Sequence, residues 1–189
     1  MIRITGGDLR SRVLQSVSGD QLRPTTSFFR EWIFNVLNYF YNLNNVVLLD
    51  LFSGTGIISF EFISRNAIKT VMIEKNTKFI KIAEKNISKL NIQNVTALKS
   101  DAIRYVTNLV RSKADIQFNV IFMDPPYDDE NITKDLLGLI FNNLELFPKE
   151  LLVITETNKD FEPVFNDKIE LYKSKSSGRT KMMIFRRIP

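Results

Sequence analysis

The hydrophobic pattern along most of the chain alternates between short apolar runs and segments of helical period. From Asn45 onwards, four apolar runs are each followed by a segment with apolar residues three or four positions apart, and a fifth run ends the series. Such runs are typical of strands buried on both faces, and the spacing between them is that of amphipathic helices. The predicted strands are residues 46–52, 70–74, 94–100, 118–124 and 150–157, and the predicted helices are residues 56–66, 76–90, 102–112 and 132–144.

The two ends of the chain each predict an antiparallel hairpin. Residues 1–5 and 12–15 alternate between apolar and polar side chains on either side of a turn-prone GGD sequence. Residues 168–175 and 180–187 alternate in the same way around SSGR. Alternation with period two, broken by glycine and small polar residues, is the usual pattern of hairpins.

One further helix is predicted over residues 27–40. Its apolar side chains recur at helical spacing, and Thr26 or Ser27 is the expected N-cap because a hydroxyl accepts from the first free backbone amides. The apolar stripe is interpreted as core packing, which also explains Trp32 without a cofactor. It consists of Phe29, Ile33, Val36, Leu37 and Phe40.

Alternating strands and helices, followed by a hairpin, predict an α/β fold. We expect a mostly parallel sheet with helices on both faces, closed at one edge by antiparallel strands. No internal repeat, low-complexity stretch or linker interrupts the chain. Residues 1–189 are therefore expected to form a single domain, with residues 1–24, the first hairpin and its loop, as an N-terminal extension.

Composition restricts the possible chemistry. The 189 residues are 44% hydrophobic, enough for one sizeable core, and no apolar run approaches the roughly 18 residues of a membrane span. A cytoplasmic protein without membrane contact is expected. The chain has neither cysteine nor histidine, which removes the commonest zinc ligands, the Ser-His-Asp triad and any thiol nucleophile. Catalysis would have to use Asp, Glu, Lys, Tyr, backbone groups or a cofactor.

Positive charge is concentrated at the C-terminus. Six of the 26 basic residues and none of the 21 acidic residues lie between Lys173 and Pro189. Lysines often protect an exposed sheet edge, and they also bind polyanions. Both interpretations stay open.

Four consecutive predicted strands each bring an acidic residue to their carboxyl end, within the strand or directly after it. These residues are Asp50, Glu74, Asp101 and Asp124. The carboxyl ends of parallel strands meet at one edge of the sheet, where doubly wound folds bind their ligands. Four carboxylates at that edge indicate a binding site.

The turn after the first strand in this series predicts a cofactor site. Gly54 and Gly56 allow a tight turn and close approach of a ligand, but Ser59 stands where a dinucleotide fingerprint has its third glycine. Asp50 would repel a pyrophosphate and attract a cation. Glu74 lies 20 residues after Gly54, the spacing at which an acid binds ribose hydroxyls.

S-adenosylmethionine has a ribose and positive charge but no phosphate, so it is the predicted cofactor. Its amino group would meet Asp50, its ribose Glu74 and its adenine Asp101. Glu74 and Asp101 also fit the simpler role of capping the helices that follow them.

The sequence DPPY after the fourth strand in this series predicts methyl transfer to an exocyclic amine. The Asp124 carboxylate and the Pro125 carbonyl would accept the hydrogens of the amine and stabilise developing positive charge. Pro125 and Pro126 fix the backbone, and Tyr127 offers a face for a flipped-out base. A plain turn at these prolines is the alternative.

Several segments resemble, in order, one known family. RITGG…LRSR, LRPTT…RE.IFN, LLDLFSGTG…FE.ISR, IEKN and FMDPPY are similar to the RsmD-type 16S rRNA guanine-N2 methyltransferases. The resemblance covers nearly the whole chain. It implies a Rossmann-like class I fold with seven strands, S-adenosylmethionine as cofactor, no metal, and methylation of a guanine N2 in 16S rRNA within the small subunit or its assembly intermediate. A monomer is expected.

The resemblance also implies that residues 1–24 face the substrate, and it implies roles for individual residues. The catalytic residues would be Asp124, Pro125, Pro126 and Tyr127; the cofactor-binding residues Asp50, Phe52, Gly54, Gly56, Glu74, Asp101 and Ala102; and the residues near the RNA Arg10, Arg12, Arg23 and Thr25. Two positions depart from the family. Ser11 stands where glycine is frequent, and Ser177 precedes Gly178 where an aromatic residue is frequent.

Two other functions stay open. Adenine-N6 methyltransferases of DNA or RNA use a similar tetrapeptide, although those acting on DNA normally carry a target-recognition segment for which this chain has little room. A non-catalytic RNA-binding assembly factor on a methyltransferase scaffold is the second alternative. A small-molecule or protein substrate fits the basic C-terminal hairpin less well.

Overall fold

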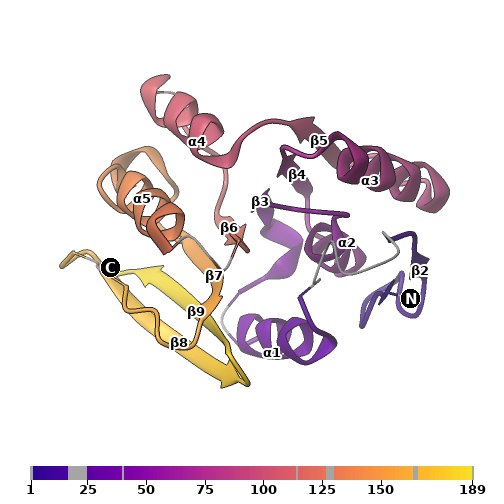
Figure 1. Ribbon diagram of the computed structural model, residues 1–189, viewed down its shortest axis with the longest axis horizontal. Helices are drawn as coiled ribbons and strands as arrows, with labels where there is room; N and C mark the ends of the chain where they lie inside the picture. Colours follow the sequence, from indigo (N-terminus) through magenta and orange to yellow (C-terminus); the bar gives the residue numbers. More distant parts are fainter. Residues whose placement is uncertain are drawn as a thin grey trace.

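The computed structural model describes residues 2–16, 25–39, 41–113, 115–126, 130–163 and 166–188. Its main sheet has seven strands: β3 (Val47–Leu51), β4 (Lys69–Glu74), β5 (Val95–Lys99), β6 (Val120–Met123), β7 (Leu152–Asn158), β8 (Ile169–Ser177) and β9 (Thr180–Arg187). Their order is β5-β4-β3-β6-β7-β9-β8 (Figure 1). Five strands are parallel, and β9 and β8 close one edge antiparallel to their neighbours. The predicted sheet is confirmed.

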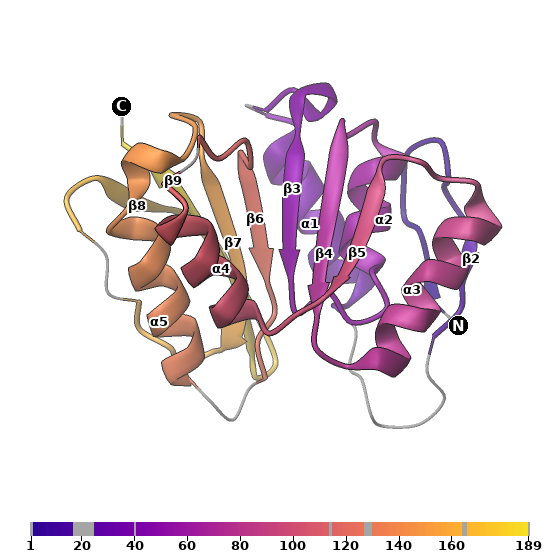
Figure 2. The ribbon, with the colours of Figure 1, turned by 90° about the horizontal axis from the view of Figure 1, so that it is seen from above.

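In the described part of the chain, five α-helices cover the two faces of this sheet. They are α1 (Ser27–Leu37), α2 (Ile57–Ser64), α3 (Thr77–Leu90), α4 (Ala102–Arg111) and α5 (Glu130–Phe141), and two 3-10 turns, η1 (Leu43–Asn45) and η2 (Leu144–Leu146), join them to strands. Apolar side chains of α1, α2 and α3 belong to one core cluster, and those of α4 and α5 to another. Figure 2 shows α4 and α5 side by side.

Side-chain alternation along the strands separates the two clusters. In β3, Leu48 packs with the cluster of α1 to α3, whereas Leu49 and Leu51 pack with that of α4 and α5. All three side chains are fully buried, as expected for a central parallel strand. Asp50 lies on the same face as Leu48, in the wall against α2, because residues two apart in a strand share a face.

The N-terminal hairpin consists of β1 (Ile2–Arg3) and β2 (Val13–Leu14), paired antiparallel. It rests on α2, since the Asp8 amide donates to the Ser64 carbonyl at 2.7 Å and the Leu9 amide to Ser64 Oγ at 2.9 Å. The hairpin is confirmed, with strands shorter than the alternation predicts.

Local geometry shows why glycine suits two of these positions, residue 11 and residue 178. Ser11 has φ +65°, in the left-handed region that glycine adopts most easily. Glycine at this position would therefore relieve backbone strain. Gly178 has φ +60° at the turn between β8 and β9, so the turn requires glycine whatever residue precedes it.

The α1 helix begins as predicted, because Thr26 Oγ1 accepts from the Phe29 amide. Phe29, Ile33 and Leu37 are buried, and Trp32 and Val36 are partly buried against the same cluster. Phe40 lies outside the described residues. No helix in the described ranges is both long and apolar enough to cross a membrane.

Candidate active site

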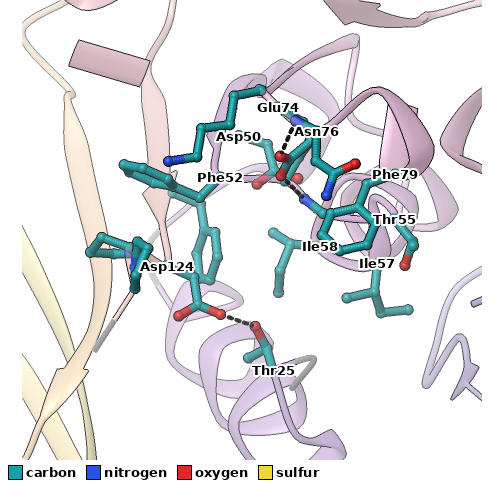
Figure 3. A pocket seen from close by; sticks show the side chains of 16 residues that line it. Thr25, Asp50, Phe52, Thr55, Ile57, Ile58, Glu74, Asn76, Phe79 and Asp124 are labelled. Carbon is teal, nitrogen blue, oxygen red and sulfur yellow. Dashed lines mark hydrogen bonds between the residues drawn. The ribbon is translucent and has the colours of Figure 1, made fainter. Parts of the chain in front are cut away.

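A pocket of about 330 Å³ lies at the carboxyl ends of β3, β4 and β6. Chain order reverses between β3 and β6, which is the position where doubly wound sheets bind ligands. In Figure 3, Asp124 and Thr25 lie at one end of the pocket and Glu74 and Asn76 at the other. The lining residues are Thr25, Asp50, Phe52, Ser53, Gly54, Thr55, Ile57, Ile58, Glu74, Lys75, Asn76, Phe79, Phe122, Asp124, Pro125 and Pro126.

Asp50 is a buried acid in the pocket wall. Ser59 of α2 holds its Oδ2, through the amide at 3.2 Å and through Oγ at 2.7 Å. Burial raises the pKa of Asp50 to about 7; the Glu74 charge adds to the rise, and the hydrogen bonds from Ser59 oppose it. The serine that breaks the glycine fingerprint is therefore the residue that anchors this carboxyl.

We expect the raised pKa of Asp50 to make stability depend on pH. The folded protein keeps this proton up to about pH 7, whereas the unfolded chain releases it near the ordinary pKa of 3.8. The unfolded state therefore binds fewer protons between these values, and the free energy of unfolding falls as pH rises from about 4 to about 7.

Asp50→Asn removes this ionisation, so the wild type should lose stability relative to the variant across that window. Urea unfolding of both proteins at several pH values measures the difference, with Asp135→Asn, an exposed change on α5, as control. A wild-type-to-variant difference that stays constant with pH would show that Asp50 titrates normally.

Glu74 holds the glycine turn in place. Its Oε2 accepts from the Gly54 amide at 3.0 Å and its Oε1 from the Asn76 amide at 2.7 Å. The N-cap of α3 is Asn76, which accepts from the Lys78 amide at 2.9 Å. Glu74 is therefore not the helix cap, and its carboxylate lies in the pocket wall.

The backbone of the turn after β3 is tightly constrained. Phe52 has φ +60°, which is rare for a bulky residue and typical of functional sites, and Gly56 has φ +87°. A Cβ on Gly56 would lie 2.5 Å from Met72 Cε and 3.0 Å from the Phe60 ring. The turn thus depends on glycine both for conformation and for the close packing of α2 on β4.

Gly56→Ala should therefore distort the turn and weaken cofactor binding. Two control substitutions separate the effect of backbone strain from that of steric overlap. Gly178 also has a positive φ, but a Cβ there would meet open space, and Gly138 in α5 has open space without a positive φ. We expect Gly178→Ala to cost about 1 kcal/mol, and Gly138→Ala to stabilise by up to about 1 kcal/mol. Thermal unfolding and cofactor titration check the ranking, and equal losses in all three would contradict the steric argument.

Asp124 stands at the other end of the pocket, directly after β6. Thr25 Oγ1, at the residue before the N-cap of α1, donates to Asp124 Oδ2 at 3.4 Å. Thr25 is buried, so its hydroxyl faces Asp124 rather than solvent. Pro125 and Pro126 line the same pocket. Tyr127 lies outside the described residues.

Other predicted site residues lie away from the pocket walls. Asp101 is exposed and caps α4, its Oδ1 accepting from the Arg104 amide at 3.0 Å, and Ala102 is the first residue of that helix. Their role toward the cofactor stays a prediction. Arg10 and Arg12 are exposed on the N-terminal hairpin, and Arg23 lies outside the described residues.

Glu156 is a candidate that the sequence reasoning missed. It is buried near the end of β7 and lines a small cavity with Pro125 and Pro126. The fifth parallel strand, like the four before it, thus brings an acid to this edge. The segment ITETN contained the signal, since its acid stands two residues before the end of the strand at Asn158.

A buried ionic cluster behind Thr25 was also missed. Glu61 of α2 is fully buried and accepts from Arg30 Nε at 2.9 Å, from Arg65, and from the amide and hydroxyl of Thr5, both at 2.9 Å. Arg30 also donates to the Thr25 carbonyl. This cluster joins the N-terminal hairpin, α1 and α2, and so positions the residue that contacts Asp124.

The pocket combines charge and apolar surface in a way that suits a cationic cofactor. The acidic side chains of Asp50 and Glu74 lie at one end and that of Asp124 at the other, and apolar side chains such as Ile58 lie between them (Figure 3). Within the described residues, no three potential metal-binding side chains come together.

The sheet order, the glycine turn after β3 and the Asp-Pro-Pro sequence after β6 define a Rossmann-like class I methyltransferase fold. The chain belongs to the family described as Conserved hypothetical protein 95, whose model matches residues 2–186. The predicted fold and the predicted RsmD-type family are thereby confirmed.

Individual proteins agree with this assignment. The ribosomal RNA small subunit methyltransferase D of Buchnera aphidicola is 29% identical over 184 residues, covering 97% of this chain and 92% of its own. An Escherichia coli structure described as a candidate methyltransferase, yhhF, has a TM-score of 0.84 at 25% identity, covering 98% of this chain and 97% of that one. A Streptococcus mutans structure described as a candidate SAM-dependent methyltransferase shares the fold, with a TM-score of 0.61 at 18% identity over 80% of this chain and 47% of its own.

Proposed function

We propose that the protein transfers a methyl group from S-adenosylmethionine to the exocyclic N2 amine of a guanine in small-subunit ribosomal RNA. The observation that carries this proposal is the position of Asp124, which lies with Pro125 and Pro126 at the mouth of a pocket whose far end is acidic. The Buchnera relative acts on small-subunit rRNA by name, which supports the RNA substrate.

The residues present fit S-adenosylmethionine. Asp50 and Glu74 would hold its amino group and ribose, and the apolar side chains Phe52, Ile58 and Phe79 would cover its adenine and carbon chain. Among the described residues that line the pocket, Lys75 is the one lysine or arginine, so they offer an anionic phosphate little to bind. The SAM-dependent protein with the same fold supports this cofactor.

The chain itself contributes orientation and electrostatics. When bound, the cofactor supplies an electrophilic methyl group and leaves as a neutral thioether, so the protein needs neither a metal nor an oxyanion hole. Asp124 and the Pro125 carbonyl would accept hydrogen bonds from the two N–H groups of the guanine amine, orient its lone pair and stabilise the positive charge that develops as the N–C bond forms and the S–C bond breaks. The methylated amine would then release one proton to solvent. The Thr25 hydroxyl, which donates to Asp124 Oδ2 at 3.4 Å, would help to orient this carboxylate.

The substrate would be the small subunit or its assembly intermediate, and the protein would act as a monomer in the cytoplasm. The test is to incubate it with labelled S-adenosylmethionine and, in separate reactions, unmodified small subunits, naked 16S rRNA and DNA, then identify the labelled nucleoside. N2-methylguanosine from rRNA or subunits is expected. N6-methyladenine would overturn the guanine assignment and keep the amine chemistry, and cofactor binding without any labelled product would favour the non-catalytic assembly factor.

A further inference from the structure

Phe28 is a large aromatic side chain that is about half exposed to solvent. It is the second residue of α1, and 48% of its surface is exposed. The Thr26 cap fixes this end of the helix, and the Phe28 ring packs edge-on against the buried Phe29 with ring centroids 5.3 Å apart. A large apolar ring that is rigidly held and half exposed is suited to bind a flat partner.

A cation from the far end of the chain covers this ring. Lys175 Nζ of β8 lies 5.8 Å from the centre of Phe28. The register explains the contact: Lys175 pairs with Met182 of β9, which belongs to the core cluster beneath α1, so the two side chains point to the same face of the sheet. Figure 1 shows the end of β8 beside α1.

More positive charge surrounds this contact. Lys173 and Lys175 are exposed and lie two residues apart on β8, and Arg179 is exposed at the turn to β9. No acidic residue lies between Lys173 and the C-terminus. Lys181 differs, because its ammonium donates to the Phe161 carbonyl at 3.3 Å.

This basic surface adjoins the proposed active site. Asn158 at the end of β7 pairs with Thr180, so the turn between β8 and β9 lies at the same edge of the sheet as Asp124. Phe28 lies three residues from Thr25, whose hydroxyl contacts Asp124. A strand of RNA with one base at Asp124 would therefore have its neighbouring nucleotide within reach of α1.

We propose that Phe28, Lys175 and Arg179 form a binding surface for the RNA nucleotide next to the methylated guanine. The base stacks on Phe28, and Lys175 exchanges its contact with the ring for a phosphate, which Arg179 also binds. Stacking on an exposed aromatic ring combined with cations is how single-stranded RNA is commonly held. The positive charge matches a polyanion, and the proposal rests on the proposed function.

The first test is the apparent KM for the RNA substrate. Phe28→Ala should raise it about tenfold, Phe28→Trp should keep it near the wild-type value, and the affinity for S-adenosylmethionine should not change in either variant. Tyr39→Ala is the matched control, because Tyr39 is 92% exposed just beyond the other end of α1. An unchanged KM for Phe28→Ala, or an equal rise for Tyr39→Ala, would overturn the stacking role.

The second test is the salt dependence of RNA binding. Lys175→Gln with Arg179→Gln should flatten the slope of log affinity against log salt by about 0.7, since the two side chains bind one phosphate and each phosphate neutralised on a single strand contributes about 0.7. Lys149→Gln with Lys168→Gln is the control, because it removes the same charge from the opposite end of the sheet. Equal slopes in the two double variants would refute the phosphate contacts.

These outcomes are distinct from failure of the proposed function. If the wild type methylates no RNA, the proposed function is wrong. If the wild type methylates RNA and the variants of this surface match it in both tests, only the surface is wrong.

Discussion

Replacement of Asp124 by alanine is expected to lower turnover about 100-fold or more while cofactor affinity stays nearly unchanged. The reason is that Asp124 lies at the opposite end of the pocket from Asp50 and Glu74, the acids proposed to hold the cofactor (Figure 3). Its carboxylate would act on the amine only as positive charge develops, so its loss should reduce the rate of the chemical step rather than ground-state binding.

Single-turnover rates with saturating RNA and calorimetric titration of the cofactor separate these two effects. Asp124→Asn retains one acceptor oxygen and should lose less activity than alanine. Asp135→Ala, which removes an exposed acid from α5, is the control for a general loss of charge. Turnover of Asp124→Ala within a few-fold of the wild type would remove the proposed role of Asp124.

Substitutions of Thr25 test whether the orientation of the Asp124 carboxylate matters for turnover. Thr25→Val removes the hydroxyl that donates to Asp124 with little change in shape, and Thr25→Ser keeps it. If the hydroxyl orients the carboxylate, the serine variant should recover the turnover that the valine variant loses, and neither should alter cofactor affinity.

The strands and helices could be predicted because burial imposes a period on them. The last strand was predicted at its observed limits, Thr180–Arg187, because polar residues flank its apolar run on both sides. The role of an acid at the start of a helix was harder to predict. A residue such as Asp101 suits both a helix cap and a ligand-binding residue, and the sequence alone contains no distance to distinguish them. The structure places Asp101 as a cap.

Side chains joined across long sequence separations could not be predicted from periodicity. Arg30 and Glu61 each stand in a helix where a charged residue normally faces solvent, and they are 31 positions apart. Ser59 looked like a missing glycine, although it binds Asp50. The motifs RITGG, RE.IFN and FE.ISR contain Thr5, Arg30 and Glu61, so the resemblance had marked the cluster without revealing its geometry.

Glu61→Ala is expected to destabilise the protein by about 3–5 kcal/mol, because it leaves the buried guanidinium group of Arg30 and the partly buried one of Arg65 without their carboxylate. Urea unfolding measures this change. Glu170→Ala is the matched control: it removes the partner of Arg186 from an ion pair that is about 40% exposed on both sides, and should cost at most about 1 kcal/mol. Glu61→Gln, which keeps one acceptor and the side-chain shape, should fall between the two.

Glu61→Gln should also affect catalysis under conditions where the protein is still folded. Arg30 connects Glu61 to the Thr25 carbonyl, and Thr25 contacts Asp124, so loosening the cluster should disturb Asp124 under conditions where the protein is still folded. We expect turnover of Glu61→Gln to fall while its cofactor affinity is kept, because Asp50 and Glu74 are held by Ser59 and the glycine turn instead. If Glu61→Gln loses stability but keeps wild-type turnover, the cluster only attaches the hairpin and α1 to the core. If turnover and stability both fall, this buried charge cluster links folding of the N-terminal segment to the position of the proposed catalytic acid.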